Sequence, residues 1–250
     1  MKKKIIITLC VLLLILTGFF GFRLISGKST NDFSKGVLAV NINKTKYLKG
    51  EIVKIQITAV DANGKIECNA NLKLTINGTE AKNIAKSSTC GTTAQNFDYS
   101  FNFEPEKTGV YRLKLTNTDT KVTITNSFDV VSERNLDIVR ETATRIDPLK
   151  KDRNSMKLVV TVVKDYSGEI SDIFPKGFAI PWQGPAKITG NKIFWQVNLK
   201  AGETKELTYE YSAPKVVPAL YKFGENGEWI VVAANTQESK TVLPTLPKLK

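Results

Sequence analysis

Histidine is absent from this chain of 250 residues. Its absence excludes the commonest general base, the Ser–His and Cys–His nucleophile pairs, and most zinc sites. The sequence also lacks a glycine-rich phosphate loop after a strand, a G-x-S-x-G elbow, and any metal-binding spacing of cysteine and histidine. The 24 acidic residues are scattered, and nothing in the sequence places two of them across a cleft. We therefore predict no enzymatic activity, no cofactor and no metal site.

Acidic residues are outnumbered: 36 Lys and Arg face 24 Asp and Glu, which gives a formal charge of +12. Residues 1–28 hold five of the cations and no acid, so 31 basic and 24 acidic residues remain beyond them. The remaining cations are mostly single lysines between apolar residues, whereas nucleic-acid binders gather charge on one face. We expect no nucleic-acid partner. Anionic wall polymers and lipid headgroups stay open as partners of a basic surface.

The N-terminus has the pattern of an export signal, because Lys2–Lys4 precede the uninterrupted apolar run Ile5–Phe22. A helix over this run would be about 27 Å long, close to the thickness of a bilayer core. The positions before a cleavage site near Gly27 lack the required small residues, so we predict a retained signal anchor over residues 1–28, with cleavage as the alternative. The positive-inside bias then predicts a single-pass protein of the cell membrane. Its N-terminus would be cytoplasmic, and the bulk of the chain, after a stalk at residues 29–36, extracytoplasmic.

Cysteine is scarce, with three residues in the chain. Cys10 lies inside the apolar run, which leaves Cys68 and Cys90 as the pair in the exported part. An even pair in an exported domain favours a disulfide, and two free buried thiols are the alternative.

Apolar and polar residues alternate along residues 37–131, as a sheet with one buried face requires. Turn signals such as Asp61–Gly64 separate the alternating segments, which favours an antiparallel sandwich. The alternating runs are Ile52–Val60, Asn71–Asn77, Phe97–Phe103, Val110–Leu115 and Val122–Val130.

A second set of strands follows a polar linker at residues 132–136 and extends over residues 137–235. Met156–Val163 is apolar on both faces, which is typical of a central strand. The other runs are Ile193–Leu199, Leu207–Tyr211 and Trp229–Ala234, and Trp195 and Trp229 are expected in the core. Residues 236–250 are rich in Pro and Lys, and we predict a disordered tail there.

Two motifs resemble known modules. Glu106–Tyr111 is similar to the tyrosine corner of immunoglobulin-like folds, with Tyr111 delivered by a glycine turn onto a strand; an ordinary core tyrosine is the alternative. Together with Tyr47–Val53, Thr108–Leu115 and Phe128–Val130, it makes residues 37–131 resemble bacterial Ig-like and macroglobulin-type modules. The thioester motif of a complete macroglobulin is missing, so protease trapping is not implied.

The run Ile193–Pro214 resembles a module of repetitive surface proteins of bacteria and archaea, with the pattern W-x-x-x-L-x-x-G-E-x-x-x-L-x-Y-x-Y. That resemblance implies a spacer or display unit. The expected architecture is therefore all-β: two tandem immunoglobulin-like antiparallel β-sandwiches after one N-terminal transmembrane helix.

Aromatic residues offer the one candidate for ligand contact. Trp182 lies between prolines in Ile180–Pro185, and Phe174 and Phe178 are close in sequence. Exposed rings would stack on sugars, whereas rings that fold back would close one end of the sandwich.

These observations predict a membrane-anchored surface protein with a structural or adhesive role, whose partner is an unidentified surface protein. One alternative is an extracytoplasmic module that binds cell-wall glycan. A second is a pilin-like filament subunit, although no Gly-terminated leader precedes Ile5.

Overall fold

Every regular element in the described part of the chain is a β-strand. The computed structural model describes residues 33–92, 97–150 and 153–235. Within these ranges no helix has the length and apolarity needed to cross a membrane. The predicted signal anchor (residues 1–28), the first four stalk residues (29–32) and the predicted tail (236–250) lie outside the described residues.

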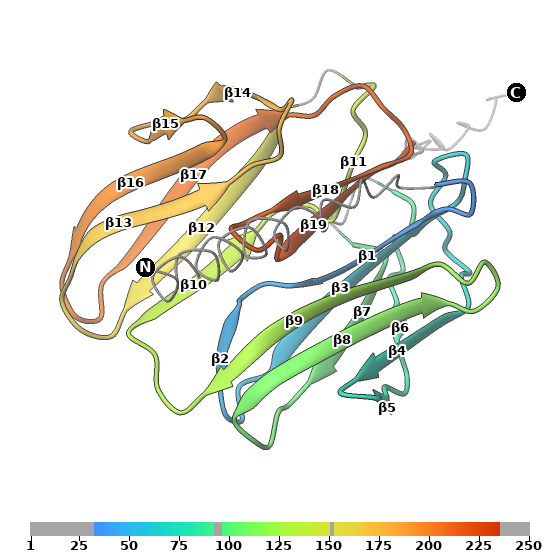
Figure 1. Cartoon of the computed structure of the whole chain (residues 1–250), viewed down its shortest axis with the longest axis horizontal. Helices are drawn as coiled ribbons and strands as arrows, with labels where there is room; N and C mark the ends of the chain where they lie inside the picture. The colour runs from blue at the N-terminus through green and yellow to red at the C-terminus, as the bar shows by residue number, and fades with distance from the viewer. Residues whose placement is uncertain (1–32, 93–96, 151–152, 236–250) are drawn as a thin grey trace, which may run out of the picture. The chain divides into compact units, whose positions relative to one another are not determined.

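The first sandwich consists of two sheets that share no strand (Figure 1). One sheet has the order β1-β3-β7-β6, with β1 at Val37–Ile42, β3 at Val53–Val60, β7 at Tyr99–Phe103 and β6 at Ala85–Lys86. The other has the order β2-β9-β8-β4-β5, with β2 at Lys46–Leu48, β9 at Thr123–Val131, β8 at Gly109–Asn117, β4 at Leu72–Ile76 and β5 at Thr79–Glu80. Across the first sheet, β1-β3-β7-β6 corresponds to strands A-B-E-D of an immunoglobulin sandwich. Across the second sheet, β9-β8-β4 corresponds to strands G-F-C.

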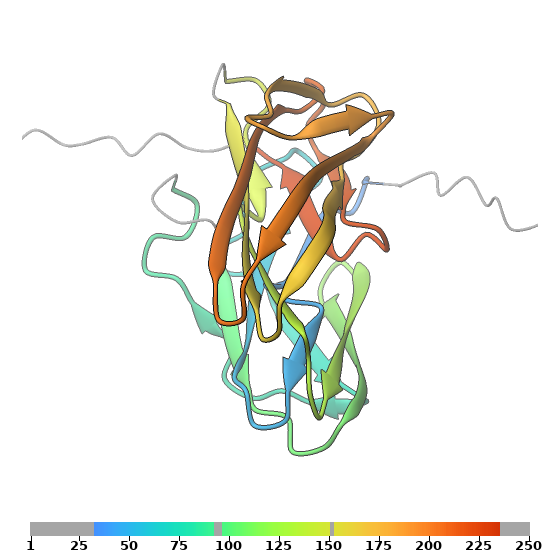
Figure 2. The same ribbon diagram turned by 90° about the vertical axis from the view of Figure 1, so that its left-hand side faces the viewer.

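The second sandwich combines a four-stranded sheet with two three-stranded sheets. The four-stranded sheet has the order β10-β12-β17-β14, with β10 at Leu136–Glu141, β12 at Asn154–Val162, β17 at Thr204–Ser212 and β14 at Ala179–Trp182. The three-stranded sheets are β13-β16-β15 (Tyr166–Ile173, Lys192–Leu199, Lys187–Thr189) and β11-β19-β18 (Arg145–Ile146, Trp229–Ala233, Ala219–Phe223). The neighbouring pairs β12–β17 and β13–β16 can be followed in both views (Figures 1 and 2).

The two sandwiches share one feature of strand pairing. In each, a short strand pairs in parallel with the last strand: β2 with β9, and β11 with β19. All the other pairs between named strands in the described residues are antiparallel. The amide of Gly224, just after β18, donates to the carbonyl of Ile173 at the end of β13, at 2.8 Å, and so connects the two three-stranded sheets.

Two apolar cores hold the sandwiches together. The first gathers Tyr47, Ile55, Leu74, Leu115 and Phe128, and its members alternate with exposed residues along the strands. The second contains both tryptophans expected in the core, Trp195 and Trp229, with Tyr209, Tyr211 and Phe223 around them. The apolar strand β12 lies between β10 and β17, as the sequence predicted for a central strand.

One sequence expectation is wrong on the outer face of the first sandwich. Thr58 and Asp98 fall on the polar side of the alternating runs Ile52–Val60 and Phe97–Phe103, so alternation predicts that they face solvent. Both are fully buried, because residues of the second sandwich cover this part of the sheet. The described residues from Phe33 onward accordingly belong to one compact unit.

Candidate functional site: the junction between the sandwiches

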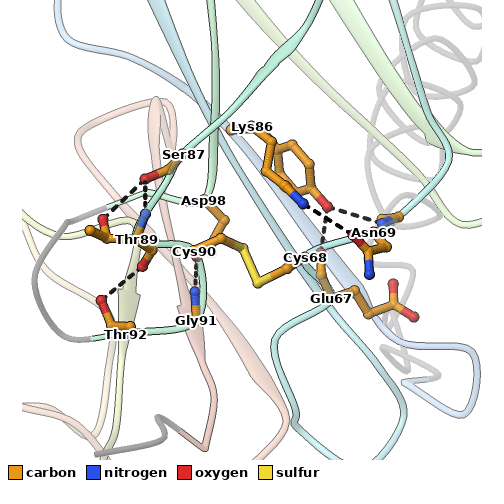
Figure 3. Close-up of a disulfide and its surroundings, with 12 residues drawn as sticks. Glu67, Cys68, Asn69, Lys86, Ser87, Thr89, Cys90, Gly91, Thr92 and Asp98 are labelled. Atoms are coloured by element: carbon orange, nitrogen blue, oxygen red, sulfur yellow. Dashed lines mark hydrogen bonds between the residues drawn. A yellow bond between two sulfur atoms is a disulfide. The ribbon is translucent and has the colours of Figure 1, made fainter. Parts of the chain in front are cut away.

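The structure contains the disulfide between Cys68 and Cys90, with the Cα atoms 5.7 Å apart (Figure 3). Cys68 follows β3, and Cys90 lies in a turn between β6 and β7. Both side chains are half-buried, and they line a surface cavity of about 330 Å³. The bond therefore connects two loops at the surface, outside the strands that form the core.

Tyr111 lies on β8, where the sequence motif placed it. Its hydroxyl donates to the carbonyl oxygen of Lys107 at 3.0 Å and accepts from the amide of the same residue at 3.4 Å. Its ring stacks on Phe128, with centroids 5.3 Å apart and planes at 10°. The hydroxyl thus bonds back to the turn before the strand, which is the contact that defines a tyrosine corner.

The three aromatic residues expected to share a ligand-contact loop do not share one surface. Phe174 and Phe178 are buried in the second core, where Phe178 packs against Tyr221 and Phe223. Trp182 is 47% exposed and lies on the edge strand β14. The structure therefore leaves Trp182 alone as an exposed aromatic ring in this segment.

The indole ring of Trp182 lies close to the backbone of its own turn, at Gly184. A Cβ on Gly184, whose φ is +55°, would lie 3.3 Å from two atoms of the indole ring, so only glycine lets the ring rest against this backbone. Across the strand pair, Trp182 is in register with Glu210, whose carboxylate is 3.2 Å from Arg153. An exposed ring beside a paired carboxylate and guanidinium is a surface that can stack on an apolar sugar face.

The sandwiches meet through an apolar cluster that belongs to neither core. We call it the junction cluster. Strand β19 is buried on both sides, because Trp229 and Val231 belong to the second core while Ile230 and Val232 belong to the junction cluster. The junction cluster consists of Val37, Ala39, Val60, Ile66, Ile230, Val232 and Ala234.

Two asparagines connect strand backbones across the junction. The side chain of Asn41 on β1 donates to the carbonyl of Ile230 at 2.6 Å and accepts from its amide at 2.7 Å. The amide nitrogen of Asn126 on β9 donates to the carbonyls of Val40 and Glu228. Each bond satisfies a backbone group that burial would otherwise leave unpaired, at a cost of about 1–3 kcal/mol per group.

A buried ion pair lies at the centre of the junction. Arg145 of the second sandwich is 3% exposed, and Asp98 of the first is fully buried. The Nε of Arg145 contacts both carboxylate oxygens of Asp98, at 3.1 and 3.0 Å. Thr58 donates to the same carboxylate at 3.0 Å and lies 2.8 Å from the hydroxyl of Thr144. This network joins side chains of both sandwiches.

A second ion cluster lies at the linker side of the junction. Lys44 and Arg134 each pair with both Glu51 and Asp137, and the Lys44–Asp137 and Arg134–Asp137 contacts are 2.8 Å. Burial alone would raise the pKa of Glu51, but hydrogen bonds from Arg134, Lys44 and the Leu48 amide lower it to about 2. Glu51 therefore stays ionised at neutral pH.

This pKa shift predicts a pH dependence of stability. A carboxyl whose folded pKa lies below its ordinary value of 4.5 stabilises the fold above that value. The stabilisation is lost as the pH falls toward about 2. Urea unfolding on both sides of this interval should show that Glu51→Gln removes part of the wild-type pH dependence there. Equal pH dependence of wild type and variant would show that the cluster contributes nothing.

A cleft of about 220 Å³ lies beside the junction and is lined by residues of both sandwiches, among them Asn43, Arg140 and Glu228. At its base Arg140 pairs with Asp172 at 2.5 Å, and the hydroxyl of Tyr209 donates to the same carboxylate at 2.9 Å. Burial raises the pKa of Asp172, against the opposing effects of Arg140 and Tyr209. The Asp172 carboxylate is thus paired with Arg140 and Tyr209, whereas Nε of Arg140 and Oε2 of Glu228 are buried without a hydrogen-bond partner among the described residues.

In the described ranges, no group of three or more His, Cys, Asp and Glu residues is placed to hold a metal ion. The expectation of a non-enzymatic protein is not tested by this observation and stays a prediction.

Sequence reasoning missed the junction residues. Arg145 lies 47 positions after its partner Asp98 and belongs to the other sandwich. No periodicity and no motif in the sequence distinguishes these two residues or Asn41. The signal that existed was the apolar run Trp229–Ala234, because a strand apolar on both faces must be covered on both sides.

Comparisons with known proteins give no close relative. No family model matches the sequence, and no curated protein does either. Among solved structures, a trypsin-activated alpha-2-macroglobulin from Escherichia coli is similar at 16% identity and a TM-score of 0.32. The match covers 76% of this chain but 14% of the macroglobulin.

Two further structures are similar over most of their own length. A chimeric titin Z1Z2 tandem has 11% identity, covers 80% of this chain and 98% of its own, and has a TM-score of 0.24. A collagen adhesin from S. aureus has 15% identity, with 82% and 95% covered and a TM-score of 0.25. TM-scores this low establish neither a fold nor a function. The class of the protein, an all-β chain whose sheets pack around two apolar cores, therefore rests on strand order and register.

Proposed function

We propose that this chain is a membrane-anchored surface protein whose two sandwiches form one stiff unit that displays loops and strand edges to another surface protein. The observation that carries the proposal is the junction, where an ion pair, an apolar cluster and the contacts of Asn41 to backbone are buried. Domains with small polar interfaces move relative to each other by default, whereas a buried, apolar interface holds them in one arrangement. Stiffness of this kind suits a spacer or display role.

Two other observations support the location outside the cell. A disulfide persists in oxidising compartments and is rare in the cytosol, and the Cys68–Cys90 bond is present in the structure. The apolar run Ile5–Phe22 after three lysines fits a signal anchor.

Protease shaving of intact cells or protoplasts tests the topology. With a tag at the C-terminus, the expected result is loss of the tag and retention of a small N-terminal fragment in the membrane fraction. A matched copy with the tag at the N-terminus should keep it. A protected C-terminal tag, or a shortened protein in the medium, would overturn the anchored display model.

A second candidate function is glycan binding, which the exposure of Trp182 favours. Trp182 is 47% exposed on an edge strand, and the linings of the two cavities at the junction do not include it. Flat aromatic platforms suit extended polymers better than small soluble sugars, and cell-wall glycan has that form.

If this second function is correct, Trp182→Ala should weaken retention of the chain on insoluble peptidoglycan by roughly two- to tenfold, the range expected for one aromatic contact. Val216→Ala is a matched control, since Val216 is also an exposed apolar residue, at 54%. Equal retention of wild type and both variants would leave Trp182 without a glycan role.

A further inference from the structure

The loop that carries Cys90 supplies two partners to the buried ion pair of the junction. The amide of Gly91, next to Cys90, donates to Oδ1 of Asp98 at 3.1 Å (Figure 3). One residue further, the carbonyl of Thr92 accepts from Nη2 of Arg145 at 2.5 Å. The loop therefore contacts the anion of the first sandwich and the cation of the second.

The other end of the disulfide is fixed to the first sandwich. On either side of Cys68, the carbonyl of Glu67 accepts from the Tyr99 hydroxyl at 2.6 Å, and the amide of Ala70 donates to that hydroxyl at 3.0 Å. The Cys68–Cys90 bond thus connects a fixed segment to the loop that completes the ion pair. Gly91 has a φ of +81°, and a Cβ on this residue would lie 3.3 Å from the sulfur of Cys68. Both values favour glycine at this position.

The disulfide is open to a thiol. It lines the 330 Å³ cavity together with Lys65, Asn69 and Thr92. A lysine at the rim attracts an attacking thiolate and stabilises the thiolate that leaves.

We propose that the Cys68–Cys90 disulfide controls how firmly the two sandwiches are joined, and that its reduction loosens the junction. A dithiol supplies the electrons: one thiolate attacks a sulfur of the bond, and a mixed disulfide forms as the other cysteine leaves as thiolate. The second thiol of the reagent then resolves the mixed disulfide, which yields two protein thiols and an oxidised reagent. This proposal rests on the contacts of the junction and does not depend on the display function.

Reduction of the disulfide should loosen the junction because the ion pair beside it is buried. Asp98 and Arg145 are buried, and a buried ion pair is favourable only while its remaining hydrogen-bonding groups are satisfied. Without the disulfide, the loop loses its connection to Cys68, and the Gly91 and Thr92 contacts compete with water. The ion pair then has fewer protein partners, and the strand β19 that packs beside it opens more often.

Hydrogen–deuterium exchange of the full chain in detergent tests this, with dithiothreitol as the probe. Reduction should speed exchange in β19, where the amides of Ile230 and Val232 bond to Asn41 and Thr144, by about tenfold, as expected for the loss of one hydrogen bond to a charged group. Exchange in β12 and β17 should not change.

The double variant Cys68→Ser/Cys90→Ser is the matched control. Without reagent it should show the fast exchange of β19, and dithiothreitol should add nothing. Two results would overturn the proposal. Faster exchange confined to residues 87–92 would show that the disulfide stabilises its own loop alone. Faster exchange throughout the first sandwich would show that it stabilises the core of that sandwich.

Discussion

Asp98→Ala should destabilise the full chain by about 3–5 kcal/mol, measured as the free energy of unfolding in urea. The substitution leaves the guanidinium of Arg145 buried at 3% exposure without a counter-ion. It also removes the acceptor for three donors: Nε of Arg145, the hydroxyl of Thr58 and the amide of Gly91. An unpaired buried charge is among the most destabilising changes a single substitution can make.

The control for this variant is the exposed ion pair between Asp165 and Lys200, whose side chains are 62% and 80% exposed. Asp165→Ala should leave the urea midpoint unchanged, because solvent screens such pairs. The double variant Asp98→Ala/Arg145→Met should lose less stability than Asp98→Ala alone, since no charge is then left buried. Equal midpoints for wild type and Asp98→Ala would show that the junction ion pair adds nothing to stability.

The fold class was accessible from sequence because alternation encodes a half-buried sheet. Strand β3 illustrates this: Val53, Ile55 and Ile57 are fully buried, while Lys54 is exposed. The strands predicted at Ile193–Leu199 and Leu207–Tyr211 are confirmed as parts of β16 and β17. In β16 and β17 one face meets the core and the other is largely accessible to solvent, whereas the outer face of β3 is covered from Thr58 onward.

Strands that deviate from alternation were missed for identifiable reasons. All six residues of β1 are buried, so Val37–Ile42 has no polar face to mark a strand. In β13 the residues buried with Ile170 include Asp172, which pairs with Arg140, so the apolar pattern is broken. Burial by a second domain and burial through an ion pair are both tertiary effects that local patterning does not contain.

The candidate site was the least predictable part. The count of cysteines was enough to predict the disulfide, because only one pairing was possible outside the apolar run. The partners of Asp98 were not predictable, since Arg145 belongs to the other sandwich. Likewise, the spacing of Phe174, Phe178 and Trp182 suggested one loop, but strand β14 carries Trp182 to an edge while the phenylalanines turn into the core.

Trp229→Ala should lower the free energy of unfolding by about 3–5 kcal/mol. The indole is 1% exposed in the second core, and its Nε1 donates to the carbonyl of Ala143 at 3.3 Å. Removing it leaves a cavity in the core and takes the donor away from a part-buried carbonyl. Because the next residue, Ile230, belongs to the junction cluster, a shift of β19 should also weaken the contact between the sandwiches.

Trp182→Ala is the matched control, since it removes the same side chain from an exposed edge and should change stability by no more than about 0.5 kcal/mol. The two variants can be compared by urea unfolding and by exchange of the β1 amides, whose strand contacts β19. Loss of stability in Trp229→Ala with unchanged exchange in β1 would show that the two faces of β19 act independently. Faster exchange of β1 in Trp229→Ala alone is the expected result, because one rigid strand carries both contacts and cannot move on one side only.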